Sequence, residues 1–248
     1  MSLAAASLAT RVSQEQERSR AAARHHFEVL MLPPNLVSHA RLALALALAA
    51  VGGGGPCVLA LGLAAACIAL DPLDGWLARL LGQETAFGAL YDVAVDNLVR
   101  ALLWAGAAAG AVSSGSSGGG SSPPFWAAWA AAPAVLEGLT LACTHAAGGA
   151  AWKTGCFRDA PRWVRAVAAG GFRSPAGALA MAGLFGLPLW LYARACLPAG
   201  GPLTSDAWGL LLLPGRLLAA AVEVWLVGRR LGQLLEEDTA ARLRRSAG

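Results

Sequence analysis

The sequence predicts an all-α integral membrane protein with six transmembrane helices. Hydrophobic residues make up 56% of the 248-residue chain and charged residues only 14%, whereas a soluble domain carries about 25% charged residues. The apolar residues gather in long stretches, as helices that cross a bilayer require. Lysine and arginine collect in alternate connections between these stretches. Together, the three observations favour a bilayer over water as the surroundings of the chain.

Six apolar stretches are candidate spans. In chain order they cover residues 36–51, 57–77, 87–112, 125–152, 175–197 and 208–227. Residues 113–124 read SSGSSGGGSSPP, which is typical of a flexible linker. We expect this linker to connect the third and fourth spans without taking part in chemistry.

The basic residues predict the orientation, because lysine and arginine are enriched in cytoplasmic connections. They precede the first span and follow the second, fourth and sixth spans, whereas the opposite connections hold none apart from Arg194. We therefore expect both termini in the cytosol. We divide the chain into a cytosolic N-terminal segment (residues 1–33), a helical domain (34–230) and a cytosolic tail (231–248). The arginines of the N-terminal segment, with Phe27 and Leu30, predict an amphipathic juxtamembrane helix.

The five cysteines are odd in number and include no CxxC pair. This pattern disfavours a disulfide framework or a zinc site, and we expect isolated thiols that pack as small apolar groups. The net charge is only +4, and no basic stretch alternates with aromatic residues. We therefore expect no nucleic-acid partner.

Four aspartates lie in or beside the second and third spans, where charged groups are costly and usually functional. Asp71 and Asp74 share one helix face, and Asp92 and Asp96 share another. A short connection near residues 80–87 turns the chain back, so the two faces can meet near the cytosolic surface. Crowded carboxylates repel one another unless cations neutralise them, and their hard oxygens suit Mg²⁺ or Mn²⁺. We therefore predict that all four bind two divalent metal ions, which could grip a diphosphate.

Small residues accompany the aspartates on the same two faces. Gly75 and Ala78 continue the first face and Gly88 begins the second, so a nucleotide diphosphate can approach the backbone there. Arg79 is placed to pair with phosphate oxygens. The combined spacing is D-x2-D-G-x2-A-R-x8-G-x3-D-x3-D, and residues 71–96 match it at every defined position.

This spacing resembles the signature of the CDP-alcohol phosphatidyltransferases. The resemblance implies a six-helix membrane fold, usually a homodimer, with its site open to the cytosol. It also implies transfer of a phosphatidyl group from CDP-diacylglycerol to a small polar alcohol, with release of CMP. In a eukaryotic cell, we expect the endoplasmic reticulum as the location.

The resemblance also assigns roles to individual residues. It implies that Asp71, Asp74 and Asp92 are metal ligands, and that Asp96 both binds metal and takes the proton of the acceptor hydroxyl. The residues that it implies for contact with the CDP moiety are Gly75, Ala78, Arg79 and Gly88.

The approach to the first span bears on the acceptor. Residues 34–41 read PNLVSHAR and are similar to the P-N-L-x3-A-R segment that opens phosphatidylinositol synthases. This similarity makes myo-inositol the best candidate acceptor, and it places Asn35 and Arg41 near the nucleotide or the lipid phosphate. Glycerol 3-phosphate, serine, an inositol phosphate and a phospholipid stay open as alternatives.

Polar residues in and after the fourth span are candidates for an acceptor pocket. Glu137 and Thr140 share a helix face, and polar groups at membrane depth face either a cavity or a partner helix. Lys153 and Arg173 follow in a basic connection, where they either recognise the acceptor or anchor the loop.

Two interpretations without catalysis stay open. A six-helix transporter would bind its cation near the membrane midplane, between internal repeats, but the aspartates lie near one surface and no repeat is visible. A scaffold without activity would not need four aspartates at this spacing. Release of CMP would separate the enzyme from both.

Overall fold

The computed structural model describes residues 25–52, 55–113, 123–146 and 156–246. Every regular element in these ranges is helical, and six helices are long and apolar enough to cross a membrane. The prediction of an all-α, multi-pass integral membrane protein is confirmed.

The helices follow one another along the chain with short connections. Those that could span the membrane are α2 (Pro33–Gly52), α3 (Cys57–Leu81), α4 (Ala86–Ser113), α5 (Pro123–Leu141), α8 (Pro175–Cys196) and α9 (Asp206–Ser246). A π-helical turn, Ala142–Ala146, extends α5, a 3₁₀ turn, Pro202–Thr204, precedes α9, and α7 (Arg162–Phe172) lies between α5 and α8.

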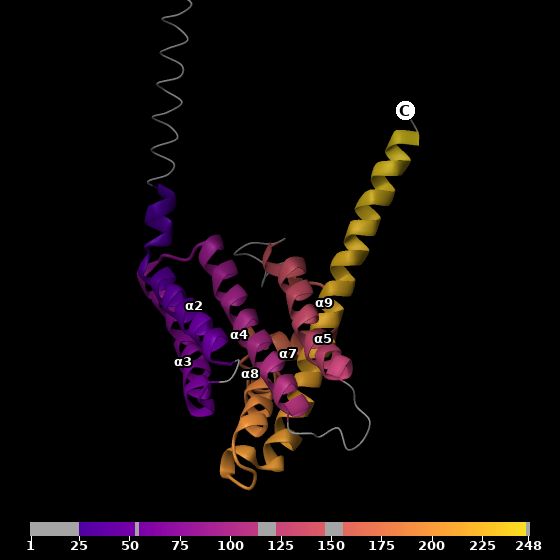
Figure 1. Cartoon of the computed structure of the whole chain (residues 1–248). Coiled ribbons are helices and arrows are strands. Elements are labelled where there is room, and N and C mark those ends of the chain that lie inside the picture. The colour runs from indigo at the N-terminus through magenta and orange to yellow at the C-terminus, as the bar shows by residue number, and fades with distance from the viewer. Residues whose placement is uncertain (1–24, 53–54, 114–122, 147–155, 247–248) are drawn as a thin grey trace, which may run out of the picture.

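The two largest differences from the expected spans are the length of α9 and the presence of α7. Helix α9 continues to Ser246, well beyond the expected end of the sixth span at residue 227. Its 41 residues correspond to about 60 Å, twice the hydrocarbon thickness of about 30 Å, so its end extends beyond the other helices (Figure 1). Helix α7 was not expected, because its residues lie in a connection recognised only by its basic charge.

Two expectations fall partly on residues outside the described ranges. Residues 25–30 are helical, but the rest of the expected amphipathic segment, residues 1–24, lies outside them. The fourth span was expected to reach residue 152, and the described helix reaches Ala146. The start of α2 and the end of α9 lie at the same end of the molecule (Figure 1), as an even number of spans requires.

A tight turn between α3 and α4 places the two acidic faces. Gly82 ends α3 with φ +63°, and its N–H donates to the carbonyl oxygens of Ala78 and Arg79. Gln83 N–H also donates to the Ala78 carbonyl, at 2.9 Å. Glycine favours this left-handed conformation because it has no Cβ. The chain therefore reverses within a few residues, and α4 begins at Ala86.

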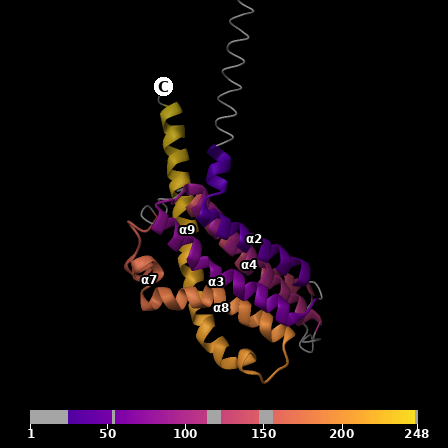
Figure 2. The same cartoon turned by 90° about the vertical axis from the view of Figure 1, so that its left-hand side faces the viewer.

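Helix α2, which carries Asn35 and Arg41, is the third wall of the site. It packs against α3 more extensively than α4 does, and it also contacts α4; both views show the three helices side by side (Figures 1 and 2). Buried small and aliphatic residues, among them Ala45, Ala64 and Val99, fill the space between them. The acidic faces of α3 and α4 therefore meet around side chains of α2.

Helices α8 and α9 cross closely at two glycines. A Cβ on Gly183 would overlap the backbone of Arg216, and a Cβ on Gly215 would overlap the carbonyl oxygen of Leu179. Small residues allow such close approach between helices in membranes. The crossing holds Arg216, which is 6% exposed, inside the bundle.

A disulfide bond joins Cys57, at the start of α3, to Cys196, at the end of α8. The expectation that all five cysteines are isolated thiols was therefore wrong for this pair. The two residues are 139 positions apart, and only the packing of α3 beside α8 brings them together. An odd number of cysteines requires one free thiol and does not exclude a bond. Cys57 precedes Asp71 by fourteen residues, about 21 Å along a helix, so the bond lies far from the aspartates.

Alkylation with N-ethylmaleimide checks this bond. We expect denatured protein to take up three groups without reductant, at Cys67, Cys143 and Cys156, and five after reduction. Cys57→Ser should raise the uptake without reductant to four, because Cys196 loses its partner. Intact mass measures the uptake, and Cys143→Ser, the control, should lose one group under both conditions. Five groups on the unreduced wild type would contradict the bond.

Candidate active site

The four aspartates come together between α3 and α4. Asp71, Asp74 and Asp92 each place one carboxylate oxygen within 4.8 Å of those of the other two. Asp74 is buried, and the side chain of Asp96 is only 13% exposed. The arrangement expected from the two matched helix faces is therefore present in the structure.

Arg41 of α2 lies inside this cluster and contacts all four aspartates. Its Nη2 lies 2.8 Å from Asp71 Oδ1 and its Nη1 lies 2.7 Å from Asp74 Oδ2. The same two nitrogens also form ion pairs with Asp92 and Asp96. The side chain is 0% exposed. The guanidinium therefore lies among the four carboxylates that the sequence predicts as metal ligands.

The cluster keeps a large excess of negative charge. One guanidinium faces four carboxylates, and the next cation, Arg100, reaches Asp96 only at 3.5 Å from its Nη1. Partly buried like charges repel one another strongly. Carboxylate oxygens at this separation are the donor set that Mg²⁺ and Mn²⁺ prefer, so the residues present fit divalent ions.

Local hydrogen bonds fix the most buried aspartate. Ser38 Oγ of α2 donates to Asp74 Oδ2 at 3.0 Å, and the N–H of Gly75 donates to Asp74 Oδ1 at 2.6 Å. Both oxygens of Asp74 are therefore held in place. Ser38 was not selected from the sequence, since only the packing of α2 on α3 makes it a neighbour of Asp74.

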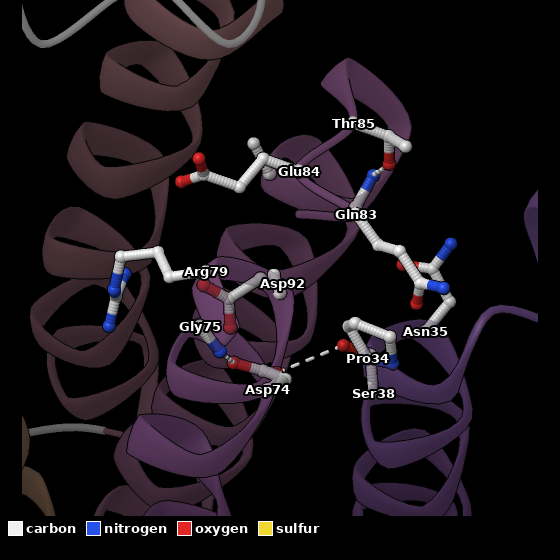
Figure 3. A pocket seen from close by; sticks show the side chains of 13 residues that line it. Pro34, Asn35, Ser38, Asp74, Gly75, Arg79, Gln83, Glu84, Thr85 and Asp92 are labelled. Atoms are coloured by element: carbon white, nitrogen blue, oxygen red, sulfur yellow. Dashed lines mark hydrogen bonds between the residues drawn. The ribbon is translucent and has the colours of Figure 1, made fainter. Parts of the chain in front are cut away.

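A first cavity of about 190 Å³ opens beside Asp74 and Asp92. Figure 3 shows it between α2 and the α3–α4 turn, with Asp74 and Ser38 at one end and Glu84 and Thr85 at the other. Five of the residues expected to contact CDP line this cavity, whereas its described lining does not include Arg41. Those five are Asn35, Gly75, Ala78, Arg79 and Gly88.

Gly88 is required by the close approach of α2. A Cβ at this position would lie 2.8 Å from Asn35 Oδ1 and 3.0 Å from Thr85 Oγ1. Asn35 is held in turn, because its Nδ2 donates to the carbonyl of Val29 at 2.6 Å, and the N–H of Gly88 donates to Thr85 Oγ1 at 2.9 Å. A larger residue would displace the wall of the first cavity.

A second cavity, of about 270 Å³, lies on the other side of the aspartates. Asp71, Asp92 and Asp96 form one end of it, and Asp92 borders both cavities. Its remaining polar lining comes from α4, α5, the π-helical turn after α5 and α9, and most of its apolar lining comes from α7, α8 and α9. The carboxylate cluster therefore separates two cavities of different character.

A buried ionic network lies beside the second cavity. Glu137 of α5 accepts from Arg100 Nε at 2.6 Å and from Arg216 Nη2 at 3.3 Å. Arg216 Nη1 also donates to Glu223 at 2.8 Å, so both charged residues in the membrane-spanning part of α9 belong to this network. Asn97 joins the network by donating to the carbonyl of Glu137 and accepting from Arg100.

The candidate acceptor residues fall in different places. Glu137 and Thr140 line the second cavity. Arg173 is exposed at the end of α7, and the described lining of the cavity does not include it. Lys153 lies outside the described residues. Arg100 was not selected for this cavity, although it lies one turn beyond Asp96, and its guanidinium stacks over Phe185 of α8, 4.6 Å from the ring centroid.

Comparison with known proteins gives the family. The family model described as CDP-alcohol phosphatidyltransferase matches residues 31–199. This segment includes α2, the four aspartates and the polar residues that line the two cavities, except Glu223 of α9. No curated protein and no solved structure matches the chain. Since the matched segment covers more than half of the sequence, the chain belongs to the CDP-alcohol phosphatidyltransferase family, whose members transfer a phosphatidyl group from a CDP-alcohol to another alcohol and release CMP.

Proposed function

We propose that this enzyme transfers the phosphatidyl group of CDP-diacylglycerol to an uncharged polyol, with myo-inositol as the best candidate, giving phosphatidylinositol and CMP. The observation that carries this proposal is the position of the four aspartates between two cavities. One cavity suits a nucleotide diphosphate and the other suits a small acceptor.

The donor binds in the first cavity. Its small residues Gly75, Ala78 and Gly88 leave room for the cytidine diphosphate beside the backbone, and Arg79 is in reach of phosphate oxygens. The apolar acyl chains extend into the surrounding bilayer. This orientation directs the diphosphate toward Asp74 and Asp92, which border the cavity.

Asp71, Asp74, Asp92 and Asp96 hold the metal ions. Two Mg²⁺ or Mn²⁺ ions bound there would neutralise the diphosphate and make its phosphorus more electrophilic. Asp96, at the end of the second cavity, takes the proton of the acceptor hydroxyl. The acceptor oxygen then bonds to the phosphorus that carries diacylglycerol, the bond from this phosphorus to the bridging oxygen breaks, and CMP leaves.

The charges around the second cavity favour an uncharged acceptor. Arg100 is paired with Glu137, and Arg216 is paired with Glu137 and Glu223. A phosphate group would need a cation that is free to bind it, and each of these arginines already has a carboxylate partner. This supports a polyol over glycerol 3-phosphate or an inositol phosphate, and the P-N-L-x3-A-R resemblance supports inositol among polyols.

The surroundings of the enzyme follow from the distribution of charge and cysteine. The basic connections support a cytosolic site and cytosolic termini. The Cys57–Cys196 disulfide lies at the opposite end of α3 and supports an oxidising compartment there, such as the lumen of the endoplasmic reticulum in a eukaryotic cell. The family resemblance supports a homodimer.

An acceptor panel tests the function. Purified enzyme with labelled CDP-diacylglycerol and Mn²⁺ should release CMP when myo-inositol is added, and not with glycerol 3-phosphate, serine or inositol 3-phosphate. EDTA should abolish release and excess Mn²⁺ should restore it, because the ions neutralise the diphosphate. Thin-layer chromatography of the lipid product identifies the acceptor. Release that depends on a phosphorylated acceptor would contradict the uncharged acceptor, and no release with any alcohol would contradict the donor assignment.

A further inference from the structure

We propose that Arg41 is an internal counter-cation of the aspartate cluster, which holds the four carboxylates together in the metal-free protein and gives up their oxygens when divalent ions bind. The proposal rests on the use of metal ions in the proposed function. It assigns Arg41 a role in metal binding rather than in contact with the nucleotide.

The first support is the number of aspartates that one side chain contacts. Two nitrogens of Arg41 bridge Asp71, Asp74, Asp92 and Asp96, which come from two helices. No water-exposed surface remains on the side chain, which is 0% exposed. Metal-free carboxylates in this place would otherwise repel one another with little screening. The guanidinium therefore supplies the attraction that keeps the acidic faces of α3 and α4 together.

The second support is that the site does not satisfy Arg41 fully. Its Nε is buried and makes no hydrogen bond to any residue that the structure describes, although a buried donor without a partner is costly. A guanidinium bound in a permanent structural site usually has its donors satisfied. The unpaired Nε instead indicates a side chain whose position is set by the carboxylates alone.

The third support is competition for the same atoms. Arg41 uses one oxygen of each aspartate, and for Asp74 this is Oδ2, since Oδ1 accepts from the N–H of Gly75. A divalent ion that binds three of these oxygens would lie a few ångströms from the guanidinium, and the two positive charges would repel each other. One positive charge also balances only one of four carboxylates, whereas two divalent ions balance all four. The ions must therefore displace the guanidinium, and this lowers the affinity of the aspartate cluster for them.

Mn²⁺ binding to purified protein tests this role without any substrate. Free Mn²⁺ is measured by electron paramagnetic resonance for the wild type, Arg41→Gln and the control Arg230→Gln, which removes an equal charge from an ion pair on the part of α9 beyond the expected membrane span. We expect Arg41→Gln to bind Mn²⁺ about tenfold more tightly than the wild type or more, and Arg230→Gln to match the wild type. In EDTA, Arg41→Gln should melt at a lower temperature than the wild type. Addition of Mn²⁺ should raise the melting temperature of Arg41→Gln by more than it raises that of the wild type.

The sign of the change in affinity decides the outcome. If Arg41→Gln binds Mn²⁺ as weakly as the wild type or more weakly, the proposal is overturned. If its melting temperature in EDTA equals that of the wild type, the claim that Arg41 stabilises the metal-free protein is overturned. If Arg41→Gln does not fold, Arg41→Met applies the same criterion, because it also removes the charge and its unbranched, flexible side chain fills the same buried space. If the wild type binds no Mn²⁺, the metal-dependent function fails, and the proposal fails with it.

Discussion

Replacing Asp96 with asparagine should abolish turnover while the protein still binds nucleotide. Asparagine keeps the size of the side chain but cannot accept the proton of the acceptor hydroxyl, and general-base catalysis contributes roughly 10²–10⁴-fold in rate. The loss of one metal-binding carboxylate adds to the effect. We therefore expect CMP release to fall by about 10³-fold or more, measured as kcat with CDP-diacylglycerol and inositol.

Binding separates this effect from a general loss of structure. Asp96 borders the second cavity, and the described lining of the first cavity does not include it, so the affinity for CMP should change little. Asp206→Asn is the matched control, because Asp206 pairs only with Arg194 among the described residues and lies at the opposite end of the bundle. Its kcat should equal that of the wild type. Full activity of Asp96→Asn would remove Asp96 as the base.

The spans and the aspartate signature were predictable because both are local in sequence. Apolar stretches of the required length give helices in a bilayer whatever they pack against. The spacing of Asp71, Asp74, Asp92 and Asp96 places them on two helix faces, and the turn at Gly82 makes those faces meet. The end of α9 and the presence of α7 were not predicted, because charged helical segments carry no hydropathy signal.

The contributions of distant segments could not be predicted in the same way. Arg41 is thirty residues from Asp71 and more than fifty from Asp96, so its place in the cluster depends on how α2 packs. The Cys57–Cys196 bond depends likewise on the packing of α3 beside α8. The sequence predicted isolated thiols for the two cysteines and a place near a phosphate for Arg41, and it did not indicate the partners that the packing gives them.

Glu137 shows how much stability such a long-range partner can carry. Its side chain is 2% exposed and neutralises Arg100 of α4 and Arg216 of α9, so it links three helices in the interior of the bundle. Removing one member of a buried ion pair leaves a charge without a partner, which costs about 3–5 kcal/mol. Glu137→Ala leaves Arg100 without its closest carboxylate and Arg216 with Glu223 as its one carboxylate partner among the described residues. We expect a loss of unfolding free energy of about 3–5 kcal/mol, and a lower kcat because Arg100 also contacts Asp96.

Unfolding in detergent, followed by the fluorescence of the nine tryptophans, measures this loss. Glu237→Gln is the matched control, because Glu237 pairs with Arg230 on the exposed part of α9 with its side chain 63% exposed, and exposed ion pairs contribute only about 0–1 kcal/mol. Glu137→Gln should fall between the two, since an amide can still accept from one arginine. Equal losses of unfolding free energy for Glu137→Ala and Glu237→Gln would show that the interior arginines find other partners. The ionic network would then not be the interaction that holds α4, α5 and α9 together around the second cavity.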